Sequence, residues 1–98
     1  MDFAIIWTNQ ALQDLRDIVR YIALDDPAAA RRFGNFLISK SETLITFPFI
    51  ERMVPEFRED LLREILIPPY RIVYEINEPE HSSAILRIWH GARGEIEI

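Results

Sequence analysis

The sequence is poor in three residue types that many functional sites need: it has no cysteine, three glycines and a single lysine, Lys40. Without cysteine, disulfides and thiolate zinc sites are excluded. The scattered glycines cannot build a Gly-rich phosphate loop, and His81 and His90 do not lie at metal-ligand spacing from each other. We therefore expect neither a metal nor a cofactor.

Long apolar runs are missing as well. No stretch of the sequence reaches the roughly 20 residues that a membrane-spanning helix needs. The opening Met1-Asp2-Phe3 lacks the basic start of a secretory signal. Because the lack of cysteine also agrees with a reducing compartment, we expect a cytoplasmic protein with no membrane segment.

The composition describes one small globular domain that is acidic. With 98 residues, 49% of them hydrophobic and 28% charged, the chain supports one modest core, and we expect a single domain over residues 1–98. A net charge of −5 opposes broad electrostatic binding to nucleic acid, so any such role needs a local cationic patch. Ten of the eleven basic residues are arginine, which favours fixed, forked contacts over a diffuse cationic coat.

The N-terminal half predicts a strand followed by a helical hairpin. Residues 2–7 are apolar and rich in β-formers, and Thr8 offers a hydroxyl N-cap to a helix with apolar residues at three- and four-residue spacing. Asp26-Pro27 marks a restart, because aspartate caps helices and proline suits the first helical turn. A second helix is expected from Pro27 to about Thr46, antiparallel to the first.

The C-terminal half predicts a three-stranded antiparallel meander. Residues 47–60 hold no period and describe a surface connection, whereas residues 61–67, 70–77 and 83–90 read as strands with short links. If Pro68-Pro69 is a two-residue connection, Arg71 faces Leu66 and lies diagonal to Glu64. The other side of this hairpin is then an apolar face for the helices. The expected fold is α+β.

Three strand arginines, Arg63, Arg71 and Arg87, allow two interpretations. One is surface pairing with Glu64, Glu75 and their neighbours, worth about 0–1 kcal/mol for each exposed pair. The other is that the three line one concave face and clamp a phosphate or carboxylate. Surface pairing is the ordinary state of charge on the solvent face of a sheet.

Two further residues are candidates for proton chemistry. His90 ends the last predicted strand, where it suits either a proton shuttle or a hydrogen-bonded strand end. Glu56 lies in the irregular connection and is either a general base or a loop carboxylate. Trp7 and Trp89 are expected to pack in the core or at its rim.

Several short segments, read in order, resemble the RelE/ParE superfamily of bacterial toxins from type II toxin–antitoxin modules, also described as plasmid stabilisation proteins. They cover almost the whole chain. They are Trp7-Thr8 with Ala11 and Asp14-Leu15, Tyr21-Ile22-Ala23, Asp26-Pro27-Ala28-Ala29-Ala30, Arg52 with Val54-Pro55-Glu56, Arg63-Glu64, Tyr70-Arg71-Ile72-Val73-Tyr74 and His90-Gly91-Ala92-Arg93.

The resemblance implies the same fold that periodicity indicates: a strand, a helical hairpin and an antiparallel sheet. It also implies a small antitoxin that wraps the toxin in a hetero-oligomer and inserts a helix or strand into apolar grooves. That complex would repress its own operon.

The superfamily divides by target. RelE-like members cut mRNA on the ribosome, and by position Glu56, Arg71 and His90 match the base, phosphate clamp and acid of some nuclease members. ParE-like members poison DNA gyrase with no known chemistry of their own. The acidity of this chain opposes docking on RNA.

We therefore expect a ParE-like gyrase inhibitor with no catalytic residue, whose target contacts come from Arg63, Arg87 and Arg93. One alternative is an mRNA endonuclease that acts on ribosome-bound mRNA through the three residues named above. The other is an inactive relative that only binds antitoxin. Whether the protein is an enzyme stays open between these readings.

Overall fold

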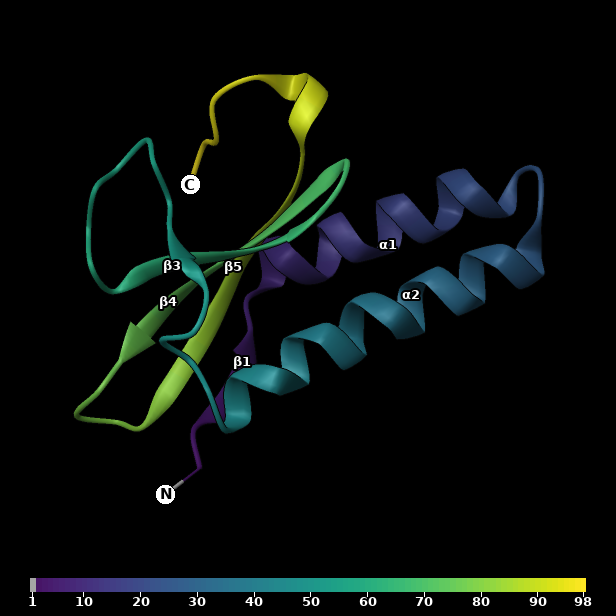
Figure 1. The fold of residues 1–98 in the computed structure, drawn as a ribbon. Helices are drawn as coiled ribbons and strands as arrows, with labels where there is room; N and C mark the ends of the chain where they lie inside the picture. The colour runs from purple at the N-terminus through teal and green to yellow at the C-terminus, as the bar shows by residue number, and fades with distance from the viewer. Residues whose placement is uncertain (1) are drawn as a thin grey trace.

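Two helices pack against one face of a mixed sheet in the computed structural model, which describes residues 2–98 (Figure 1). The expected α+β class is confirmed; Met1, at the start of the domain expected over residues 1–98, lies outside the described residues. The elements in chain order are β1 (Ala4–Trp7), α1 (Asn9–Ala23), α2 (Pro27–Glu42), the 3-10 helix η1 (Thr43–Ile45), β2 (Arg52–Met53), β3 (Leu62–Ile67), β4 (Tyr70–Asn77), β5 (Ser82–His90) and the 3-10 helix η2 (Gly91–Arg93).

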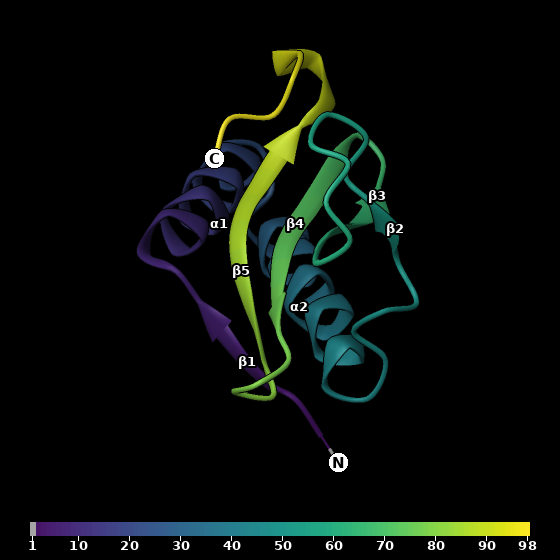
Figure 2. The same ribbon diagram turned by 90° about the vertical axis from the view of Figure 1, so that its left-hand side faces the viewer.

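The described strands form one sheet with the order β1-β5-β4-β3-β2. β3, β4 and β5 make the antiparallel meander that the sequence predicts. β1 lies parallel to β5, with Ala4 opposite Ser82 and Trp7 opposite Ile85, so the start of the chain completes the sheet beside its last strand (Figure 2).

The β3–β4 hairpin has the register that a two-residue connection predicts. Ile67 faces Tyr70 and Leu66 faces Arg71. Because side chains alternate along a strand, this register puts Glu64, Leu66 and Arg71 on one face of the sheet. The prediction for this hairpin is confirmed.

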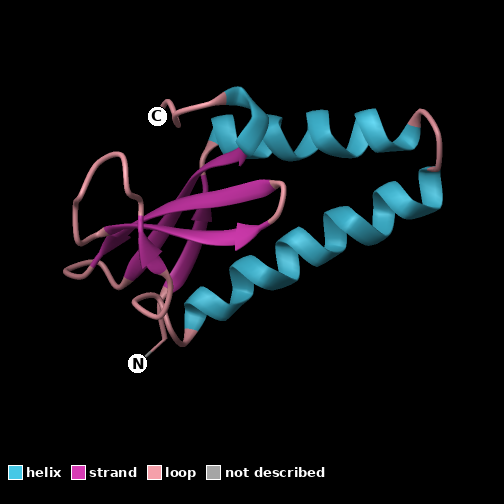
Figure 3. Ribbon diagram, turned by 45° about the horizontal axis from the view of Figure 1, so that its top comes forward, coloured by secondary structure: helices cyan, strands magenta, loops and turns pink. Residues whose placement is uncertain are grey.

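Side-chain caps fix where the two helices begin. The Thr8 hydroxyl accepts a hydrogen bond from the Ala11 N–H at 3.2 Å, and the Asp26 carboxylate accepts one from the Ala29 N–H at 3.0 Å. Each bond satisfies an N–H that the first turn leaves without a helical partner. Both predicted starts are confirmed, and the helices run antiparallel as a hairpin (Figure 3). None of the helices among residues 2–98 is both long and apolar enough to cross a membrane.

Apart from strand ends that shift by one or two residues, the structure differs from the sequence-based prediction in two places. The second helix was expected to reach about Thr46, but α2 ends at Glu42 and the chain tightens into η1, where the Thr43 hydroxyl bonds the Lys40 carbonyl at 2.7 Å. Within the connection predicted as irregular, Arg52–Met53 forms β2 against β3. A two-residue strand is too short to show a period, which explains why it was missed.

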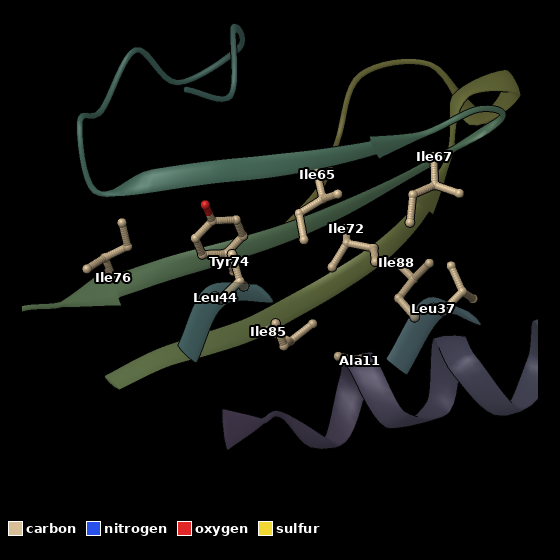
Figure 4. Packing of buried hydrophobic residues seen from close by; sticks show 10 residues of the cluster. All are labelled: Ala11, Leu37, Leu44, Ile65, Ile67, Ile72, Tyr74, Ile76, Ile85 and Ile88. Carbon is tan, nitrogen blue, oxygen red and sulfur yellow. The ribbon is translucent and has the colours of Figure 1, made fainter. Parts of the chain in front are cut away.

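The main core lies between the sheet and the helices (Figure 4). Tyr74 is fully buried there, and its hydroxyl donates to the Pro48 carbonyl at 2.6 Å, so its polar atom is satisfied. The buried members of this core are Ala11, Leu37, Leu44, Ile65, Ile67, Ile72, Tyr74, Ile76, Ile85 and Ile88.

A smaller apolar cluster covers the opposite side of the sheet, which we call the outer face. Its buried members, the outer cluster, are Val54, Leu62, Val73, Trp89 and Ile96. Trp89 is therefore a packed aromatic, as expected, and Trp7 packs partly buried against the main core. The outer face is thus partly apolar.

Candidate functional site

Charged side chains on the outer face form a continuous series of ion pairs. Glu64 of β3, fully buried, accepts hydrogen bonds from Nε of Arg52 and Nε of Arg71, each at 2.6 Å. Arg71 in turn holds both carboxylate oxygens of Glu56 through Nη1 and Nη2 at 2.7 Å. We call this series, Arg52–Glu64–Arg71–Glu56, the outer ion-pair chain.

The strand register builds this arrangement. Arg52 of β2 lies opposite Glu64, and Arg71 lies on the neighbouring strand on the other side, so Glu64 sits between two guanidinium groups. The forked geometry of Arg71 then matches the planar carboxylate of Glu56. The loop that carries Glu56 is thereby fixed to the sheet.

The contact with Arg71 changes the acidity of Glu56. Hydrogen bonds from Arg71 lower the pKa of Glu56 from 4.5 to about 2; burial opposes this shift and the Ile96 N–H, at 3.2 Å, assists it. The same pair raises the pKa of the Arg71 guanidinium above its usual value. A carboxylate this acidic is a weak proton acceptor at neutral pH, so Glu56 is poorly suited to act as a general base.

His90 lies on the other face of the sheet. In the β4–β5 register Trp89 is opposite Arg71, and His90 is opposite Tyr70, whose ring packs against the helices. Because neighbouring residues of a strand point to opposite faces, His90 is directed away from Arg71 and Glu56. The structure brings Glu56 and Arg71 together and separates His90 from both.

The surroundings of His90 are those of a hydrogen-bonded strand end. Its Nδ1 accepts the Ala92 N–H at 3.0 Å, so the proton of the neutral ring lies on Nε2. Its ring meets Tyr70 edge-on with the centroids 5.1 Å apart, and burial raises the pKa of Tyr70. A cavity of about 380 Å³ adjoins His90; it is lined by Asp14, Asp17, Ile18, Tyr21, Tyr70, Ile88, His90 and Arg93.

Arg87 is held by the first helix. The Asp14 carboxylate of α1 accepts hydrogen bonds from Arg87 Nε at 2.9 Å and Nη2 at 3.1 Å, and from the backbone N–H of Ile88 at 2.9 Å. That N–H lies on β5 beyond the residues paired with β1, so Asp14 satisfies a sheet group that the strand leaves open. An aspartate on an amphipathic helix is usually solvent-exposed, but Asp14 is only 7% exposed.

Arg63 holds the loop that precedes β2. Its guanidinium donates to the backbone carbonyls of Phe49, Glu51 and Asp60 and pairs with the Asp60 carboxylate at 2.7 Å. Since Arg63 lies opposite Tyr74, it belongs to the face that receives the helices, not to the outer face. Arg93, by contrast, is exposed and stacks over the Trp89 ring at 4.1 Å.

The arginines therefore do not share one face, and the reading in which Arg63, Arg71 and Arg87 line a single concave surface is wrong. Ion pairing, the other reading, is what the three side chains do. The pairs of Arg71 with Glu64 and of Arg87 with Asp14 are largely buried, whereas Arg63 pairs with Asp60, whose side chain is 74% exposed. Among residues 2–98 no group of three or more histidine, aspartate or glutamate side chains is placed to hold a metal ion.

Comparison with known proteins gives one consistent result. The family described as "ParE toxin of type II toxin-antitoxin system, parDE" matches residues 5–94. The chain is 33% identical over 89 residues to a protein named Toxin RelE2 from Caulobacter vibrioides, covering 91% of this chain and 96% of that protein.

Solved structures show the same fold. The chromosomal ParDE toxin–antitoxin system from P. aeruginosa superposes with a TM-score of 0.73 at 20% identity, covering 90% of this chain and 95% of that one. The RelBE2 toxin–antitoxin complex from Mycobacterium tuberculosis superposes with a TM-score of 0.68 at 19% identity, covering 92% and 99%.

Proposed function

The chain belongs to the ParE toxin family of type II toxin–antitoxin systems, and from this premise we propose that it inhibits DNA gyrase by protein–protein contact and is neutralised by a cognate antitoxin. It acts in the cytoplasm, where it stabilises the replicon that encodes the pair. The observation that carries the choice of gyrase over RNA is the separation of His90 from Glu56 and Arg71.

The ion pairing of the outer face supports a toxin without chemistry of its own. A nuclease needs a base, an acid and a cation around one phosphate. Here Nε, Nη1 and Nη2 of Arg71 each donate to a carboxylate, so the fork is committed to Glu64 and Glu56 and not presented to a phosphate. The net charge of −5 also opposes docking on RNA.

Arg93 is the predicted target-contact residue that remains presented outward. Arg63 and Arg87 are engaged in internal hydrogen bonds, whereas Arg93 is exposed and its guanidinium lies over the Trp89 ring. A guanidinium stacked on an aromatic ring is already ordered, so it loses little entropy when it pairs with a carboxylate of a target protein. We therefore assign target contact to Arg93 and a structural role to Arg63 and Arg87.

Exposed apolar side chains offer surfaces for the antitoxin. Tyr21 and Leu24, at the tip of the helical hairpin, are 75% and 82% exposed. A second cavity of about 380 Å³ lies between the end of α2 and β3; it is lined by Lys40, Thr43, Phe47, Ile50, Glu51, Ile65, Leu66 and Ile67. Large apolar groups of this kind on a small protein mark protein contacts, and an antitoxin that covers them forms the hetero-oligomer.

A paired assay tests the proposal. Purified chain is added to DNA gyrase in a supercoiling assay, and separately to translating ribosomes with mRNA ends mapped by primer extension. We expect loss of supercoiling with the mRNA intact, and a concentration for half-inhibition at least several-fold higher for Arg93→Ala. Arg16→Ala, an exposed arginine on α1, is the matched control. Prior addition of the antitoxin should restore supercoiling.

The mRNA endonuclease is the alternative, and the meeting of Glu56 with Arg71 on the outer face is the observation in its favour. Codon-dependent mRNA cleavage that disappears in His90→Ala would establish it and refute the gyrase proposal. Folded protein without effect in either assay, but still bound by the antitoxin, would identify an inactive relative.

A further inference from the structure

Residues 94–98, which we call the strap, lie against the outer face without forming a strand. After η2 the chain turns back toward the loop that precedes β3 (Figure 1). The turn occurs at Gly94, whose φ of 84° is a conformation that favours glycine. The strap is thus an extended segment lying on the sheet rather than part of it.

Side chains of the sheet and its loop hold the strap by its backbone. Trp89 Nε1 donates to the Gly94 carbonyl at 3.0 Å, and Arg87 Nη1 donates to the Glu97 carbonyl at 3.1 Å. The Ile96 N–H donates to Glu56 Oε2 at 3.2 Å. These three hydrogen bonds involve only backbone groups of the strap. An extended segment of another sequence could therefore bond to the same side chains, Trp89 and Arg87 as donors and Glu56 as acceptor.

A single side chain anchors the strap in the outer cluster. Ile96 is 5% exposed, whereas its neighbours Glu95 and Glu97 are exposed and Ile98 is 59% exposed. One apolar anchor and a few hydrogen bonds to main-chain groups make a small, separable unit. When the strap leaves, the surface over Val73 and Trp89 loses its cover.

The charges match as well. The strap reads Gly-Glu-Ile-Glu-Ile, and the arginines Arg87 and Arg93 flank Trp89 on the surface that it covers. Acidic residues beside the aliphatic anchor are therefore complementary to Arg93, whose guanidinium is exposed, whereas Arg87 is paired with Asp14 and reaches the strap through the Glu97 carbonyl. The sequence of the strap therefore indicates which kind of peptide this surface would bind.

We propose that the strap is a detachable occupant of a peptide-binding surface, and that this surface takes an extended segment of a protein partner in which an aliphatic residue lies between acidic residues. The partner's segment and the strap compete for the outer cluster. Since the Ile96 N–H contacts Glu56, exchange of the strap also changes the surroundings of the outer ion-pair chain. The proposal goes beyond gyrase inhibition and does not depend on it.

The test uses the full chain and a synthetic acetylated peptide of residues 94–98 as the probe. Binding is followed through the indole N–H resonance of Trp89, with that of Trp7 as internal reference. Ile96→Asp should release the strap and shift the Trp89 resonance. The peptide should then bind this variant at least about tenfold more tightly than the wild type, because the fraction of molecules with an open surface is larger.

Matched variants separate the proposal from a general loss of structure. Ile98→Asp introduces the same charge two residues later, at an exposed side chain, and should leave peptide binding at the wild-type level. If Ile96→Asp reduces folding, Ile96→Ala supplies the same comparison with a milder change. A peptide with aspartate at its Ile96 position should not bind, and one with glutamine for both glutamates should bind several-fold more weakly.

Three results would overturn the proposal. The first is an unchanged Trp89 resonance in Ile96→Asp, and the second is equal peptide affinity for the wild type and that variant. The third is concentration-dependent dimerisation of the wild type that Ile96→Asp abolishes, because the occupant would then be the strap of a second copy. Because no gyrase is present, none of these results bears on the target of the toxin.

Discussion

Replacing Glu64 with glutamine tests whether the outer ion-pair chain stabilises the fold. The side chain of Glu64 is fully buried between Arg71, which is 14% exposed, and Arg52, which is 52% exposed. Glutamine keeps the shape but removes the charge that both guanidinium groups need. Breaking a buried pair costs about 3–5 kcal/mol. Arg52 is half exposed and can be solvated by water once the Glu64 charge is removed. We therefore expect the free energy of unfolding to fall by an amount near the lower end of this range, about 3 kcal/mol.

Urea unfolding followed by circular dichroism measures this loss. A loss of about 3 kcal/mol is a large share of the total stability of a domain of this size and lowers Tm by more than about 10 °C. Glu75→Gln, at an exposed position on β4, is the matched control and should change stability by less than about 0.5 kcal/mol. A Glu64→Gln variant as stable as the control would refute the view that the buried carboxylate organises the outer face.

The remaining predictions concern single contacts. Because the pKa of Glu56 is lowered to about 2, its pair with Arg71 stabilises the fold above the ordinary pKa of 4.5 and loses this effect as the pH falls toward 2. Urea midpoints of the wild type and Glu56→Gln should therefore differ most at pH 6 and approach each other as the pH falls from 4.5 toward 2; a constant difference would contradict the assignment. Asp14→Ala leaves Arg87 without its carboxylate and should cost about 3 kcal/mol in urea unfolding, whereas exposed Asp17→Ala should cost under about 0.5 kcal/mol. Thr8→Ala removes the cap of α1 and should cost about 1–2 kcal/mol in the same measurement, with Thr8→Ser close to the wild type.

Much of the fold follows from local signals in the sequence. The capping side chains of Thr8 and Asp26 each bond a backbone N–H only three residues later. The start of each helix can therefore be recognised from the local sequence. The two-residue link at Pro68-Pro69 fixes the β3–β4 register in the same local way. These elements were predictable because cause and effect are close in the chain.

The candidate site was less predictable because it depends on distant segments. Asp14 has the appearance of a solvent-side helix residue, and only the packing of α1 along β5 buries it against Arg87. Glu56 reaches Arg71 across 15 positions of sequence through a loop without a period. The identity of a residue does not determine which distant charged residue it will pair with, so the partners of the arginines could not be predicted from the sequence.

The parallel pairing of β1 with β5 has a consequence for synthesis on the ribosome. The Thr8 hydroxyl donates a hydrogen bond to the carbonyl of Ile85, a residue 77 positions later. β1 can therefore join the sheet only after β5 has been synthesised. Contacts of such long range form late and slow folding. A nascent chain therefore cannot complete its five-stranded sheet until β5, whose last residue is His90, has left the exit tunnel.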